Sequence, residues 1–255
     1  QKYFKCVTMR MSESGNYVNL YYNGLPPYNS WYYSPDDSNN IDWENQGEDC
    51  LNNNPCNNGE CVGSEESCYF QIPGSYIVEQ NYVISIPVDP IPRGLVVDDF
   101  YVDGEQTTGN SVSYEYPLGS VGSALNGVNM FNPCANPPDE IEDEAYSFDL
   151  YSGHPAGSSG IYHYHTTSSG PLEVLAYNIP DEVTNTTPGS AEIELYGIMC
   201  DGALVMGCVE LDKSSVDFSE LDAQNGHVHD ITDEEGNTLF SGRYHTHMCY
   251  TELST

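Results

Sequence analysis

The sequence predicts an all-β fold, an antiparallel sandwich or barrel-like domain with a disulfide-stapled, Cys-rich loop insertion. Three observations favour this fold class. Tyrosine and glycine are abundant, with 21 and 23 residues among 255, and these residues favour strands and turns. Short segments in which apolar and polar residues alternate recur along the chain, each bounded by Gly or Pro. No segment has the pattern of a convincing amphipathic helix.

The expected strands follow one another with turn residues between them. A strand pair is expected within residues 2–33, and Asn23-Gly24 is expected to form a turn in this segment. The acidic run at residues 139–144 is expected to be a solvated loop. Further strands are expected at 75–87, 95–102 and 111–116, and two buried strands at 192–199 and 202–210 should flank a turn at Asp201-Gly202.

We expect a single domain over residues 1–255, with a Cys/Asn-rich insertion at residues 34–75. Four of the nine cysteines lie between Cys50 and Cys68, a density typical of an oxidising compartment. The odd count leaves at least one thiol free, metal-bound or paired to another chain. Spacing alone does not give the connectivity, although Cys249, two residues after His247, is expected to be in a disulfide.

Several features predict a secreted protein, extracellular or at the cell surface. The chain begins at Gln1 without a signal peptide, as expected of a processed secreted form. Asn185-Thr186-Thr187 is a glycosylation acceptor and predicts a glycoprotein. No run of about 18 apolar residues is present, so no membrane span is expected.

The charge of the chain excludes one class of partner. The formal net charge is -33, from 39 acidic residues against 6 Lys and Arg. Such a field repels nucleic acid and anionic membranes and attracts cations. The acidic runs lack the full spacing of a calcium loop, so the acidity also fits solubility in a salty medium.

All seven histidines belong to two related segments. The frame Ser-Gly-x-Tyr-His-x-His occurs at residues 159–165 and returns at residues 241–247. A Gly-His pair precedes each frame, at Gly153-His154 and at Gly226-His227, and His229 extends the second pair. Chance placement would give roughly 0.2 His-x-His pairs, whereas the chain has three.

The spacing of these histidines predicts a metal site. On a strand, His163 and His165 share one face, and Tyr162 and Tyr164 lie on the other, where they can pack in the core. Imidazoles from a neighbouring strand can complete the coordination, and imidazole favours Zn or Cu. One ion, two ions or a pH-sensing cluster all fit. The predicted core ligands are His163, His165, His245 and His247, with His154, His227 and His229 as further ligands or supporting groups.

The tetrapeptide Tyr162-His163-Tyr164-His165, with Gly153-His154-Pro155 and Asn225-Gly226-His227, resembles the YHYH-domain family, which is named for it. The resemblance extends from about residue 17 onward, with the Cys-rich segment as an insertion. It implies a secreted or cell-surface β-rich domain with clustered histidines. The chain departs from the family pattern at Tyr28, where a histidine is frequent, and at Gln224, where a cysteine is common.

Three functions fit these observations. The first is a secreted acidic protein that binds Zn or Cu through paired His-x-His hairpins, as a component of an extracellular assembly or alone. The second is a coat, fibre or matrix subunit, whose unpaired cysteine or Tyr-rich surface joins copies or a polymer partner. The third is a His-ligated metalloenzyme, a hydrolase, a lyase or a copper redox enzyme, with Asp201, Asp222 or Asp230 as candidate bases. Because common catalytic motifs are absent, the sequence leaves enzymatic activity open.

Overall fold

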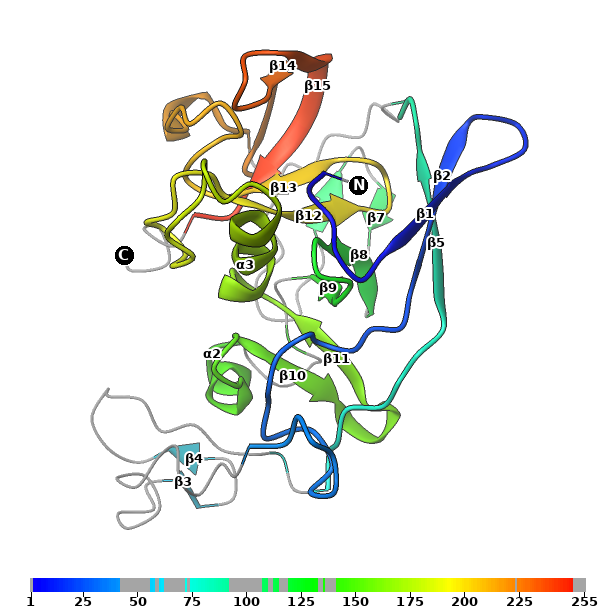
Figure 1. Ribbon diagram of the computed structural model, residues 1–255, viewed down its shortest axis with the longest axis vertical. Coiled ribbons are helices and arrows are strands. Elements are labelled where there is room, and N and C mark those ends of the chain that lie inside the picture. The colour runs from blue at the N-terminus through cyan, green and yellow to red at the C-terminus, as the bar shows by residue number, and fades with distance from the viewer. Residues whose placement is uncertain are drawn as a thin grey trace.

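An open eight-stranded sheet organises the described part of the chain (Figure 1). The computed structural model describes residues 2–41, 56–57, 60–61, 72, 74–91, 107–109, 112–114, 119–132, 135, 141–222 and 224–249. The strand order is β10-β11-β9-β8-β12-β13-β15-β14. The strands are β8 (Ser120–Ala124), β9 (Asn129–Phe131), β10 (Gly153–Ala156), β11 (Ile161–Tyr164), β12 (Leu195–Met199), β13 (Leu204–Met206), β14 (Gly226–Thr232) and β15 (Thr238–His247).

This sheet consists of two halves with the same topology. In each half an antiparallel hairpin, β8–β9 or β12–β13, comes first in the chain. Its second strand pairs in parallel with the last strand of that half, β11 or β15. That strand in turn pairs antiparallel with an edge strand, β10 or β14. The halves meet where β8 and β12 run antiparallel, with Ala124 opposite Gly197. The fold is therefore an internal repeat, with β10 and β14 at its two ends.

The two hairpin turns need glycine. Gly127 follows β8 with φ of 77°, and Gly202 follows β12 with φ of 94°. These are left-handed backbone conformations that side chains disfavour. The sequence pairs Asn126-Gly127 and Asp201-Gly202 therefore place the turns that begin both halves.

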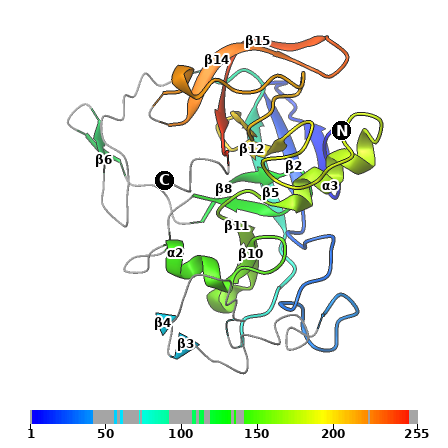
Figure 2. The same ribbon diagram turned by 90° about the vertical axis from the view of Figure 1, so that its left-hand side faces the viewer.

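A three-stranded sheet packs beside the large one (Figures 1 and 2). Leu20, Tyr22 and Ile86 form its buried cluster, and Ile198 of β12 packs against them. The Tyr22 hydroxyl donates to Asn129 Oδ1 at 3.0 Å, which ties the small sheet to β9. Its strands are β1 (Thr8–Met11), β2 (Tyr17–Tyr22) and β5 (Tyr82–Pro87), and two further hairpins are β3 (Cys56–Asn57) with β4 (Glu60–Cys61) and β6 (Thr107–Gly109) with β7 (Val112–Tyr114).

The main core forms around β11, β12 and the helix α3 (Ser169–Asn178). Tyr162 and Tyr164 are buried in it, as expected for the face of β11 opposite the histidines. Leu172 and Leu175 of α3 are fully buried against the same cluster. This helix contradicts the expectation that the chain has none. Gly and Pro in its first turn obscure the pattern, although proline is tolerated there because the first turn lacks intrahelical acceptors for its N–H groups.

The all-β, sandwich-like fold class is confirmed, and two strand pairs run parallel in addition to the expected antiparallel pairs. Strands form as expected within 2–33, 75–87, 192–199 and 202–210. The acidic run was expected to be a solvated loop, which is wrong for its last residues, because Ile141–Glu144 form the short helix α2. The strand expected at 95–102 and most of the insertion at 34–75 lie outside the described residues, so these boundaries stay predictions. Among the described helices, none has the length and apolar character needed to cross a membrane.

Candidate metal centres

The first centre consists of His154 on β10 together with His163 and His165 at the end of β11. Antiparallel pairing places His154 directly opposite His163. The Nε2 atom of His163 lies 3.1 Å from that of His154 and 2.9 Å from that of His165. All three side chains are buried.

The outer nitrogens of these rings are held by hydrogen bonds. His163 Nδ1 donates to the Ile161 carbonyl at 2.9 Å, and His165 Nδ1 donates to the Asn132 carbonyl at 2.6 Å. His154 Nδ1 lies 2.6 Å from the Ser147 hydroxyl. An imidazole whose Nδ1 carries the hydrogen presents its Nε2 lone pair on the other side, so lone pairs converge in the centre.

The imidazoles of the first centre resist protonation. Burial, with the neighbouring imidazole of His165, lowers the pKa of His154 to about 3, and burial lowers the pKa of His163 well below its usual value. Nitrogen ligands of tetrahedral zinc lie about 3.3 Å apart, given a Zn–N distance of about 2.0–2.1 Å. The observed separations are slightly shorter, so a transition-metal cation fits the donor set.

A carboxylate and a cavity border the first centre. Glu144 of α2 is half-buried, with Oε1 3.4 Å from His154 Nε2 and Oε2 4.0 Å from His165 Nε2. Figures 1 and 2 both show α2 beside β10. The cavity has a volume of about 210 Å³. Its lining includes the three histidines and Glu144, and among its other residues are Ile72, Phe131, Asn132, Pro155, Ala156 and Gly157.

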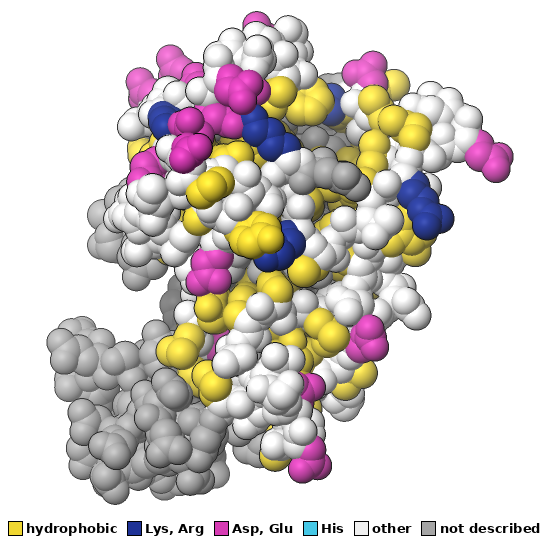
Figure 3. Space-filling view, viewed as in Figure 1, with side chains coloured by type: hydrophobic (Ala, Val, Ile, Leu, Met, Phe, Trp, Pro, Cys, Tyr) yellow, Lys and Arg dark blue, Asp and Glu magenta, His cyan; other side chains and the backbone are white. Residues whose placement is uncertain are grey.

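The second centre lies on β14 and β15, at the other end of the sheet. His227 Nε2 is 3.0 Å from His245 Nε2 and 3.1 Å from His247 Nε2. His245 Nδ1 donates to the Arg243 carbonyl at 3.1 Å, and His247 Nδ1 donates to the Gly207 carbonyl at 2.8 Å. None of the seven histidines, all of them described, is visible on the face in Figure 3, where acidic side chains are prominent.

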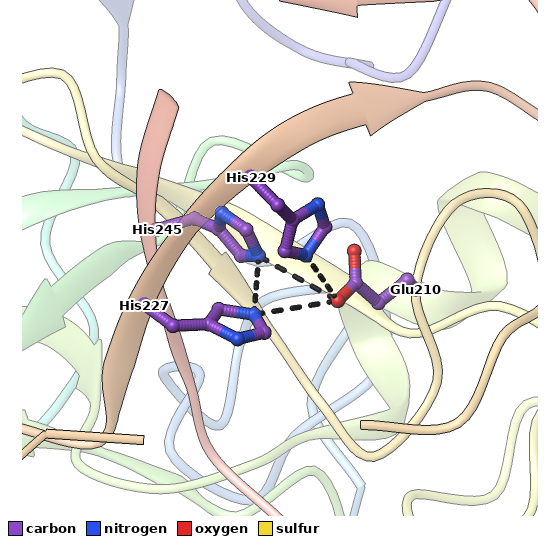
Figure 4. A group of neighbouring side chains, drawn as sticks. All are labelled: Glu210, His227, His229 and His245. Atoms are coloured by element: carbon purple, nitrogen blue, oxygen red, sulfur yellow. Dashed lines mark hydrogen bonds and ion pairs between the residues drawn. The ribbon is translucent and has the colours of Figure 1, made fainter. Parts of the chain in front are cut away.

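A glutamate approaches all four imidazoles of the second centre, and Figure 4 shows it beside His227, His229 and His245. Glu210 Oε1 is 2.8 Å from His229 Nε2 and 3.4 Å from His227 Nε2. The same oxygen is 3.6 Å from His245 Nε2 and 3.9 Å from His247 Nε2. Burial would raise the pKa of Glu210, but the imidazoles of His245 and His229 outweigh it and lower that pKa to about 2. The carboxylate is therefore ionised and can serve as a ligand.

The two centres repeat one another in register. His227 lies opposite His245 as His154 lies opposite His163. The third imidazole of each centre donates to the carbonyl that follows β9 or β13, at Asn132 or Gly207. The internal repeat of the sheet therefore extends to the hydrogen bonds of its histidines.

A tight turn introduces the Gly-His pair in each centre. The N–H of Asp149 donates to the Gly153 carbonyl, and the N–H of Asp222 donates to the Gly226 carbonyl, both at 2.8 Å. The Tyr162 hydroxyl donates to Asp149, and the Tyr244 hydroxyl donates to Asp222. A Cβ atom at either glycine would collide with that tyrosine hydroxyl. Glycine is thus required before the histidine in both copies.

All seven histidines predicted from the sequence lie in these two clusters, four in one and three in the other. Sequence reasoning missed Glu144 and Glu210, because no spacing rule links either residue to a histidine motif. The three candidate bases make other contacts: Asp201 accepts from the Ala203 N–H, Asp222 accepts from Tyr244, and Asp230 accepts from the Gly242 N–H.

Two other expectations concern residues near the centres. Cys249 is disulfide-bonded, as expected, and its partner is Cys208, next to the Gly207 carbonyl that holds His247. Tyr28, which stands where the family often has a histidine, contacts the hydroxyls of Tyr162 and Tyr164 in the core. It therefore supports β11 from the face opposite the histidines.

No curated protein and no solved structure matches the chain. The YHYH protein family matches residues 100–217. The matched stretch contains the whole first centre and Glu210, and it ends before β14 and β15, which carry the remaining histidines. Over these residues the chain is similar to the YHYH protein family, in agreement with the resemblance of its histidine motif.

Proposed function

We propose that this protein binds two transition-metal ions, one in each histidine centre, and that the ions are zinc or copper. One observation carries the proposal: in each centre one Nε2 atom, of His163 or of His227, lies 2.9–3.1 Å from the Nε2 atoms of two further histidines. Converging lone pairs repel one another in a buried site unless a cation lies between them.

The donor set supports this choice of metals. Imidazole nitrogen suits zinc and copper, whereas calcium and magnesium prefer oxygen ligands. The net charge of -33 favours the capture of any cation because it raises the cation concentration around the protein. The charge aids binding, and the imidazoles select the metal.

The protein is further proposed to be secreted and to work outside the cell or at its surface. The Cys208–Cys249 disulfide supports this location, since disulfides persist in oxidising compartments. Asn185 is exposed, as a glycosylation acceptor must be. Cys6 and Cys200 are exposed free thiols, which a role in an extracellular assembly could use.

Metal analysis of the full chain tests the proposal. We expect two equivalents of zinc or copper after dialysis against a weak chelator. The variants His165→Gln and His247→Gln should each retain one equivalent, because each removes one donor from one centre. Asp36→Asn, which removes an exposed surface charge, should retain both and so controls for nonspecific binding. The proposal would be contradicted if the wild type bound less than one equivalent of metal and no histidine variant changed that amount.

The cavity beside the first centre favours a second candidate function, a metalloenzyme. Three histidines with one open position are the arrangement of catalytic zinc sites, where the metal activates a water molecule. Hydrolysis or hydration would then be the reaction class. Activity that disappears in His165→Gln and survives in His247→Gln would support it.

A further inference from the structure

The two centres differ at one equivalent position of the repeat. Two residues after the Gly-His histidine, the first centre has Ala156 and the second has His229. Ala156 lies opposite Ile161, and His229 lies opposite Arg243. Each opposing residue precedes the first histidine of its Tyr-His-x-His motif by two positions. Ala156 and His229 are therefore structural equivalents.

In the second centre this position carries a side chain with a nitrogen atom that can bind a metal. His229 is directed at the carboxylate, with Nε2 2.8 Å from Glu210 Oε1 (Figure 4). Its other nitrogen donates to the Asp230 carbonyl at 2.8 Å, which fixes the ring. Four imidazoles and one carboxylate thus surround the second centre, enough donors to fill the coordination shell of zinc or copper.

In the first centre the same position has no donor atom. Ala156 ends in a methyl group, and it lines the cavity of about 210 Å³ that also reaches His154, His163 and His165. Glu144 stays to one side, near His154 and His165, at 3.4 and 4.0 Å. By contrast, Glu210 Oε1 lies within 3.9 Å of four imidazole nitrogens.

We propose that the metal of the first centre keeps one coordination position open to a small external ligand, whereas His229 closes the second centre. This inference rests on the proposed function. Ile72, Phe131 and Pro155 give the cavity an apolar wall. The ligand class is therefore a small molecule with one nitrogen, oxygen or sulfur donor and an apolar remainder, and water is the resting ligand.

Azide binding to the copper(II)-loaded full chain tests this inference, because azide on copper(II) produces a charge-transfer absorption. The wild type should bind one azide for every two copper ions. His165→Gln should abolish the response, and His247→Gln should leave it intact. Circular dichroism checks that each variant is folded.

Two reciprocal substitutions make the test specific. Ala156→His supplies the missing imidazole, so azide affinity should fall at least tenfold while two copper ions stay bound. Ala156→Leu fills the cavity without adding a donor and should have the same effect on azide. His229→Ala should create a second azide site at the second centre. If Ala156→His does not fold, His229→Ala together with His165→Gln and His247→Gln still tests which centre has the open position.

The outcomes separate this inference from the proposed function. Two bound copper ions without an azide response would overturn the inference and leave the proposed function standing. An azide response that survives His165→Gln and disappears in His247→Gln would overturn it as well. Failure to bind either copper or zinc would overturn the proposed function itself.

Discussion

At the scale of single residues, the chain fixes imidazoles by their outer nitrogens. His165 and His247 each donate Nδ1–H to a backbone carbonyl of a neighbouring strand end, at Asn132 and Gly207. His163 donates to Ile161, and His245 donates to Arg243, two residues earlier in the same strand. These bonds select the tautomer that presents Nε2, and they do so without any metal. The donor atoms are therefore preorganised, which reduces the entropic cost of binding an ion.

Preorganised neutral imidazoles make the metal-free protein sensitive to acid. Burial lowers the pKa of His154 to about 3 and that of His163 well below 6.5. The folded state then binds fewer protons than the unfolded state, so the stabilisation is complete above about pH 6.5 and is lost as the pH falls. Each histidine contributes a slope of about 1.4 kcal/mol per pH unit. In urea unfolding of the metal-free protein between pH 4.5 and 6.5, His154→Gln should flatten the slope by about that amount.

His229 provides a control of opposite sign. Burial works against the charged form, but hydrogen bonds with the Asp230 carbonyl and Glu210 prevail, and the pKa of His229 is raised. Its stabilisation is present below pH 6.5 and is lost as the pH rises through the raised pKa. His229→Gln should therefore not flatten the acid slope. An unchanged slope in His154→Gln would contradict the assignment of a neutral buried imidazole to the first centre.

At the scale of elements, the aspartate turn before each Gly-His pair is a repeated unit that orients the edge strand, β10 or β14. The two turns differ in burial: Asp149 is 4% exposed, whereas Asp222 is on the surface. Asp149 accepts from Tyr162 at 2.7 Å, from Ser30 at 2.5 Å and from the Tyr151 N–H at 2.9 Å. Asp222 accepts from Tyr244 at 3.1 Å.

This difference in burial predicts that replacing the aspartate by alanine lowers the free energy of unfolding by different amounts in the two turns. Asp149→Ala leaves buried donors without acceptors and should lower the free energy of unfolding by about 3 kcal/mol or more. Asp222→Ala exposes its donors to water and should cost about 1 kcal/mol or less. Urea denaturation of both variants, metal-free at pH 7, gives the comparison. Equal costs would show that the first turn does not depend on its buried carboxylate.

The same elements show what the sequence can predict. Alternation in the segments of β2 and β5 predicts strands, because a half-buried strand needs that pattern, and the Asp201-Gly202 turn predicts the buried strands β12 and β13 on either side of it. The helix α3 escaped prediction, because tertiary packing of Leu172 and Leu175 overrides a first turn that contains glycine and proline. The His-x-His faces were predictable from local geometry alone.

At the scale of the whole molecule, the sequence predicts the histidines of the two centres but does not predict the carboxylates beside them. Strand alternation fixes the faces of the histidines, and the repeated motif marks both copies. Glu144 follows β9 and Glu210 follows β13, both outside the repeated histidine motif, and only the tertiary fold brings them to the imidazoles. The parallel pairs β9–β11 and β13–β15 are likewise long-range contacts that local patterns do not encode. The missing donor at Ala156 acquires meaning only when the two halves are compared.

Because the centres lie at opposite ends of the sheet, the two halves should hold their ions independently. The Cys208–Cys249 disulfide spans 41 residues and stabilises the second half only, next to the carbonyl that orients His247. The double variant Cys208→Ser/Cys249→Ser should lose about 4 kcal/mol of stability, from the loop-closure entropy. Metal analysis should then give one ion per chain, with the azide response of the first centre intact.

Cys200→Ser is the matched control, because Cys200 is a free thiol on the same half of the sheet. That variant should keep both ions and the wild-type stability. Loss of both ions together in the double variant would mean that the β8–β12 junction couples the centres, since this antiparallel pair is the seam between the halves. Loss of the second ion alone would mean that each half of the repeat is a metal-binding unit by itself, with the open and the closed centre free to serve different roles.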